Sequence, residues 1–153
     1  MLIIQRSAME LHTTPVIPVL RRRLTLRLPQ VAQMAGPCCA ELEALARAQG
    51  RTVQGPPIFA AHGLPQDGHT PFDLDICLPV SGPGTEELPA LVCMRTVYCG
   101  PLEGLFTQGY QALLDAIAAA GRTPSGQTRE VYHDWHSPES PDNRIELQIG
   151  LAP

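Results

Sequence analysis

The two halves of the chain resemble each other. Residues 50–55 read Gly-Arg-Thr-Val-Gln-Gly and residues 121–126 read Gly-Arg-Thr-Pro-Ser-Gly, and the same spacing of 71 residues relates His62 to His133. Two residues later in register, segment 72–78 lies opposite 145–151. Upstream, the Gly-Pro pair at 36–37 lies opposite that at 100–101. Such a repeat predicts two copies of one supersecondary unit.

Hydrophobic periodicity assigns the elements of each copy. Apolar residues recur at helical spacing from Pro101 to Gly121, and the first copy predicts a helix seven residues shorter, from about Cys38 to Gln49. The order strand, helix, strand, strand occurs twice. It predicts an α+β fold of two β-α-β-β units with pseudo-two-fold symmetry, two main helices on one side of antiparallel sheets, and a ligand cleft between the repeats. The predicted strands are Ile58–His62, Phe72–Val80, Leu91–Cys99, Arg129–Asp134 and Arg144–Leu151, with a first strand within Val16–Met34.

Length and composition fit one globular domain. A chain of 153 residues is long enough to bury a core, so residues 1–153 are expected to form a single domain. Repeat 1 covers about 15–80, a Gly- and Pro-containing linker covers 81–89, and repeat 2 covers about 90–152. Residues 1–12 are left open, as a disordered extension or an added strand. Five cysteines without metal-binding spacing, and no long apolar run, predict a cytoplasmic protein without a membrane span.

On the last predicted strand, aliphatic and polar residues point to opposite faces. Ile145, Leu147, Ile149 and Leu151 alternate with polar positions, which include Glu146. Because segment 72–78 lies opposite 145–151, Asp73 is expected to occupy the position related to Glu146. The preceding predicted strand, Arg129–Asp134, carries Tyr132 and is followed by Trp135. An acid walled by aromatic rings is suited to a lipophilic cation, so we predict a pocket containing Glu146, Tyr132 and Trp135.

The second half resembles the GyrI-like (gyrase-inhibitory-protein-like) family of small-molecule-binding domains. The resemblance rests on segment 97–101 (Val-Tyr-Cys-Gly-Pro), on 130–132 (Glu-Val-Tyr) and on 144–151, and it extends over about residues 16–151. Related domains form the effector-binding part of AraC-type and multidrug-responsive bacterial transcription regulators. The resemblance implies a pocket with a glutamate on the last strand, which matches Glu146. The ligand-binding residues expected on these grounds together are Glu146, Tyr132, Trp135, Glu130, Tyr110, Asp73 and Phe59.

The leading functional hypothesis is therefore a small-molecule-binding protein for a lipophilic ligand. If that ligand is a cation, the pocket acid contacts its charge. The second is a cofactor-independent hydrolase of strained cyclopropane-type toxins, as the resemblance implies for some relatives, with Glu146 as general base and Tyr132 aligning it. The third is an interaction module of the gyrase-inhibitor type. No metal, other cofactor or membrane partner is expected, and a homodimer is left open.

Direct binding to nucleic acid is not expected. The net charge is −4, and only about 15 residues precede the first predicted strand, too few for a DNA-binding module. The chain is thus expected to be a stand-alone version of the domain. Arg21–Arg23 are expected on a solvated edge strand, and the His-x-x-His at 133–136 is expected to have a structural or surface role rather than a metal-binding one.

Overall fold

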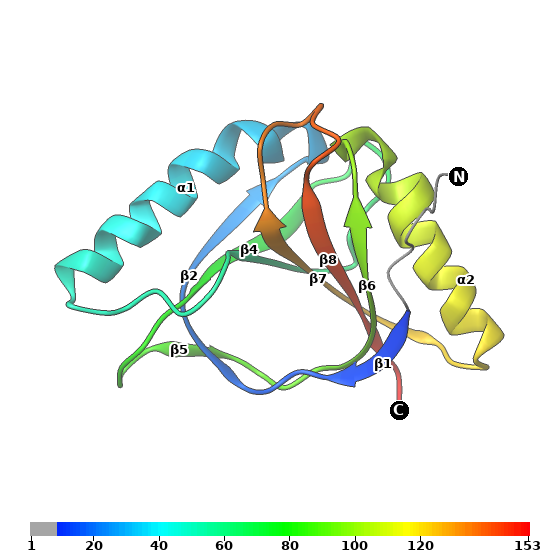
Figure 1. The fold of residues 1–153 in the computed structure, drawn as a ribbon, viewed down its shortest axis with the longest axis horizontal. Helices are drawn as coiled ribbons and strands as arrows, with labels where there is room; N and C mark the ends of the chain where they lie inside the picture. The colour runs from blue at the N-terminus through cyan, green and yellow to red at the C-terminus, as the bar shows by residue number, and fades with distance from the viewer. Residues whose placement is uncertain (1–8) are drawn as a thin grey trace, which may run out of the picture.

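Eight strands form a single antiparallel sheet in a computed structural model, which describes residues 9–153. The strand order is β1-β6-β8-β7-β3-β4-β2-β5, and helices α1 and α2 slope over one face of the sheet (Figure 1). The strands are β1 (Glu10–Thr13), β2 (Ile17–Leu26), β3 (Ile58–His62), β4 (Phe72–Pro79), β5 (Glu86–Leu88), β6 (Val92–Cys99), β7 (Pro124–Asp134) and β8 (Arg144–Leu151). The helical segments are α1 (Leu28–Ala48), a 3₁₀ turn η1 (Leu102–Gly104), a π-helix η2 (Leu105–Tyr110) and α2 (Gln111–Ala119).

The predicted repeat is confirmed at the centre of the sheet. Strands β3 and β7 pair there, and Phe59 lies opposite Glu130, its counterpart at the spacing of 71 residues. The pseudo-two-fold axis therefore passes between these two residues. The pairing of β3 with β4 and of β7 with β8 corrects one register. Ala60 pairs with Asp75 and its counterpart Val131 with Glu146, so that Asp75, and not Asp73, is related to Glu146.

Helix α1 begins ten residues earlier than the sequence pattern predicted, at Leu28 instead of near Cys38. Pro29 occupies the first turn, where a missing N–H costs nothing, and the Gln30 side chain accepts a hydrogen bond from the Arg27 N–H at 2.8 Å. Pro37, directly before the predicted helix start, lies inside the helix. The prediction of a longer second helix was therefore wrong.

The second helical segment is continuous but changes pitch. It runs from η1 through the six-residue π-helix η2 into α2, and it ends before Gly121, whose φ of +71° is the left-handed conformation typical of a helix end. Gly109, in the π-helix, lies so close to β8 and β6 that a Cβ there would be 2.7 Å from Leu147 Cδ1 and 3.4 Å from the Tyr98 ring. The π-helix thus brings this backbone against the sheet.

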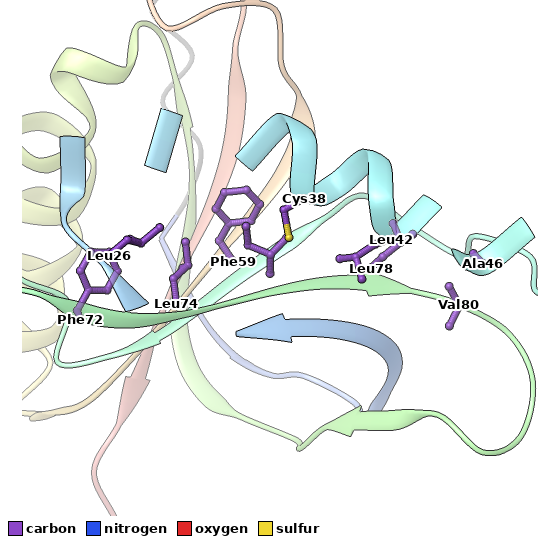
Figure 2. Packing of buried hydrophobic residues seen from close by; sticks show 10 residues of the cluster. Leu26, Cys38, Leu42, Ala46, Phe59, Phe72, Leu74, Leu78 and Val80 are labelled. Carbon is purple, nitrogen blue, oxygen red and sulfur yellow. The ribbon is translucent and has the colours of Figure 1, made fainter. Parts of the chain in front are cut away.

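The core lies between the sheet and the two helices. Alternate residues of β4 face α1, as the sequence alternation predicted, and Figure 2 shows Leu78 beneath Leu42 of that helix, with Leu74 further along the strand near Phe72. Alternate residues of β8 pack in the same way in the second cluster, beside Leu113 and Ile117 of α2: Ile145, Leu147, Ile149 and Leu151. Each such fully buried aliphatic side chain stabilises the fold by about 1.5–3 kcal/mol.

The sheet gains one short strand at each edge. β1 pairs with β6 and β5 pairs with β2, so the segment left open by the sequence contains an added strand at Glu10–Thr13, and the predicted linker contains β5. Residues 1–8 lie outside the described part. Arg21, Arg22 and Arg23 each form ion pairs with carboxylates. Among the described residues, no helix has the length and apolar character needed to cross a membrane.

Candidate ligand-binding site

An apolar cavity of about 300 Å³ lies between α1 and the centre of the sheet. A smaller cavity of about 130 Å³ adjoins it, and the two share Val31, Phe59, Leu102 and Tyr132 as lining residues. The smaller one extends toward the π-helix, where Leu105 and Phe106 line it, and Glu130 lies in its wall. Together they form one cleft beside the pseudo-two-fold axis. Its size and mostly apolar lining are typical of small-molecule sites.

Glu130 is the acid of this cleft. One carboxylate oxygen accepts a hydrogen bond from the Tyr110 hydroxyl at 2.5 Å, and the other accepts one from the Tyr132 hydroxyl at 2.6 Å. Glu130 and Tyr132 share a face of β7 because they are two residues apart. Tyr110 reaches them from the end of the π-helix. Among the described residues no arginine or histidine pairs with Glu130, so its charge has no protein counter-ion.

Burial governs the ionisation of this cluster. Desolvation raises the pKa of Glu130 above its ordinary value, and the two tyrosine hydrogen bonds offset only part of that effect. The pKa of Tyr110 and that of Tyr132 are raised well above the usual value, first by burial and then by the neighbouring carboxylate. Both phenols therefore stay protonated and act as donors to Glu130 at neutral pH.

Aromatic rings connect the acid to the protein surface. Phe59 and Tyr132 have ring centroids 4.5 Å apart, and the Trp135 ring lies edge-on to Tyr132 at 5.8 Å. Trp135 is 43% exposed, and it forms the rim of the larger cavity. The structure thus brings together five of the predicted residues: Glu130, Tyr132, Tyr110, Phe59 and Trp135.

The structure places Glu146 elsewhere. Its neighbours Ile145 and Leu147 pack beneath the helices, so Glu146 points to the opposite face of the sheet. There its carboxylate lies 3.0 Å from His133 Nε2 and accepts a hydrogen bond from Gln148 at 2.7 Å. Burial acts to raise the pKa of Glu146, but these partners outweigh it and hold the pKa below its ordinary value. The expectation that Glu146 lies beside Tyr132 and Trp135 was wrong.

Asp73 also lies on that opposite face, where it accepts a hydrogen bond from the Thr25 hydroxyl at 2.7 Å. The strand alternation in the sequence could have excluded both acids, because a residue between two core positions of one strand faces away from that core. The same rule selects Glu130 and Tyr132 as a pair.

Sequence reasoning missed part of the cleft wall. Val31 and Ala35 lie in the turns of α1 that precede the predicted helix start, and Leu102 lies in the 3₁₀ turn. Cys39 also lines the larger cavity. Burial raises the pKa of its thiol to about 11, so the thiol is protonated at neutral pH.

The fold has counterparts among solved structures. The C-terminal domain of EcmrR superposes with a TM-score of 0.79 at 19% identity, covering 95% of this chain and 98% of that domain. The structure of SAV2435 bound to tetraphenylphosphonium superposes with a TM-score of 0.60 at 13% identity, covering 95% of this chain and 94% of the other. No protein-family model and no curated protein matches the sequence.

These neighbours confirm the predicted fold, so the chain has the GyrI-like α+β fold. The chain also matches EcmrR in a complex with DNA, with a TM-score of 0.77 at 19% identity, but it spans only 57% of that EcmrR chain.

Proposed function

We propose that the chain binds a lipophilic organic cation in the cleft between α1 and the π-helix, with Glu130 as its counter-charge. The observation that carries the proposal is a carboxylate in an apolar, aromatic-walled cavity, with two phenol donors and no cationic partner among the described residues. An unpaired buried charge is costly, and a bound cation removes that cost. The SAV2435 structure supports this choice because SAV2435 is bound there to a lipophilic cation, tetraphenylphosphonium.

The rings contribute the second part of the affinity. Phe59, Tyr132 and Trp135 present faces and edges along one wall, and a cation held over an aromatic face gains about 0.5–2 kcal/mol. A ligand with aryl groups can also bury apolar surface against Val31 and Leu102. The site thus favours a cation whose charge is surrounded by apolar groups over a compact hydrated ion.

The test is a titration with tetraphenylphosphonium, followed by Trp135 fluorescence and by calorimetry. Glu130→Gln is expected to weaken binding at least tenfold, which corresponds to about 1.4 kcal/mol. Glu146→Gln is the matched control, because it removes one carboxylate from the opposite face of the sheet. The affinity of this variant for tetraphenylphosphonium should equal that of the wild type. Neutral triphenylphosphine oxide should bind equally to wild type and Glu130→Gln. Equal loss of tetraphenylphosphonium affinity in both variants would reject Glu130 as the anchor.

A hydrolase using the same cleft is the second candidate, and one observation favours it. The raised pKa of Glu130, caused by burial, is the property expected of a general base near neutrality, and Tyr132 donates to it at 2.6 Å. In this version Glu130 takes the role that the sequence assigned to Glu146. Time-dependent loss of a cyclopropane-containing substrate, abolished in Glu130→Gln, would favour hydrolysis over binding alone.

A further inference from the structure

Two chain segments cross on the face of the sheet opposite the helices. One joins β1 to β2 and the other joins β5 to β6, and each runs from an edge strand to the second strand from the opposite edge. They are bonded where they meet: the Thr14 N–H donates to the Leu91 carbonyl at 2.9 Å, and the Leu91 N–H donates to Thr14 Oγ1 at 2.8 Å. This crossing partly covers the centre of that face.

Arg129 lies beneath the crossing and is 4% exposed. Its Nη1 donates to Thr14 Oγ1 at 3.3 Å and its Nη2 donates to the Pro89 carbonyl at 2.8 Å. Neither acceptor carries a charge, and among the described residues no carboxylate forms an ion pair with Arg129. Desolvation lowers the pKa of Arg129, yet a guanidinium keeps its proton in proteins. The site therefore contains a buried positive charge without a counter-ion.

A cavity of about 440 Å³ adjoins Arg129 on this face. Its charged lining comprises three arginines (Arg21, Arg23 and Arg129) and two aspartates (Asp73 and Asp75). Asp75 is already held by Arg23 at 2.7 Å and Arg21 at 3.6 Å, and Asp73 accepts from a threonine hydroxyl. Arg21 is also paired with Glu86 at 3.2 Å, just outside the lining, so Arg129 is the lining arginine that has no carboxylate partner among the described residues.

We propose that this cavity binds a small oxyanion, a carboxylate or a phosphate, with Arg129 as its principal partner. A guanidinium has five N–H donors in a planar fork, and the crossing segments engage only two of its nitrogens. The fork suits the paired oxygens of either anion. Arg21 and Arg23 lie in the same wall, but Asp75 and Glu86 already pair with them, so Arg129 provides the charge that no carboxylate in the described part of the chain neutralises. His62 and Gln127 add polar groups to the lining.

The proposed oxyanion site is separate from the cation cleft. Arg129 and Glu130 are consecutive in β7 and therefore point to opposite faces of the sheet. The strand thus presents a positive charge to one cavity and a negative charge to the other, and either site can be removed without deleting residues of the other.

The test is a titration of the intact chain with inorganic phosphate and, separately, with succinate, read by calorimetry and thermal shift. Sodium chloride at matched ionic strength is the control for general salt effects. We expect saturable binding with a rise in melting temperature that chloride does not produce. The anion that binds more tightly identifies which of the two classes the site takes. Responses to both anions no larger than the chloride response would overturn the proposal.

Two variants locate the site. Arg129→Lys keeps the charge but removes the fork, and Ala60→Leu places a larger side chain in the cavity while leaving Arg129 intact. Each is expected to weaken anion binding at least tenfold, and Ala60→Leu still tests the site if Arg129→Lys fails to fold. Glu130→Gln should retain full anion binding. Wild-type anion affinity in Ala60→Leu would place the binding elsewhere and refute the inference.

Discussion

Replacing Gly109 by alanine should destabilise this protein, although the same change inside an exposed helix usually stabilises by about 1 kcal/mol. The new Cβ would be 2.7 Å from Leu147 Cδ1 and 3.4 Å from the Tyr98 ring. Leu147 is 0% exposed and Tyr98 6%, so neither side chain can move into solvent. Overpacking a core costs about 1–3 kcal/mol. Because this contact is very short, we expect a net loss of about 1–2 kcal/mol.

The assay is urea unfolding, in which Gly109→Ala should lower the midpoint and leave the slope unchanged. A second variant isolates the cause, because Leu147→Val removes the δ carbon that the new Cβ would meet. In the Leu147→Val background, Gly109→Ala should cost at least about 0.5 kcal/mol less than in the wild type. A Gly109→Ala protein as stable as the wild type, or costs that simply add, would refute the close-packing argument.

Two further predictions concern ionisable groups. The raised pKa of Glu130 means that the folded protein holds the carboxyl proton more tightly than the unfolded chain does. The free energy of unfolding should therefore fall as the pH rises from the ordinary glutamate pKa through the raised pKa of the folded state. In urea unfolding across pH, Glu130→Gln should not show this fall. In maleimide labelling read by mass spectrometry, exposed Cys99 should react first and buried Cys77, whose pKa burial raises to about 12, should react last. Tetraphenylphosphonium should slow the labelling of Cys39, which lines the cleft, without changing Cys99.

The fold was predictable because both its internal repeat and its strand alternation can be recognised directly in the sequence. Strands Ile58–His62 and Arg144–Leu151 have the predicted bounds, and the aliphatic face of β8 lies under the helices as expected. The start of α1 was misplaced because a Gly-Pro pair is a typical boundary signal, whereas here Pro37 lies within the helix and an earlier proline, Pro29, occupies its first turn. Tertiary packing decides between two such signals.

The site was predictable in part. The sequence grouped Tyr132 and Trp135 with an acid, but it favoured Glu146 over Glu130. The choice depends on which face of each strand is covered, and the aliphatic alternation of β8 already places Glu146 on the face away from the helices. The π-helix carries no periodicity of its own that distinguishes it from an α-helix over six residues. The contact of Tyr110 with Glu130 was therefore beyond sequence reasoning.

The edge strands have a consequence for the origin of the chain. β1 precedes the first repeat but completes the sheet of the second beside β6, and β5 precedes the second repeat but completes the sheet of the first beside β2. Each half thus contributes one N-terminal strand, here called an arm, to the sheet of the other half. Two identical half-length chains with this connectivity would form a homodimer by exchanging arms, and joining them end to end gives the present topology. Divergence after such a fusion accounts for the different residues at equivalent positions beside the pseudo-two-fold axis, Phe59 in the first repeat and Glu130 in the second.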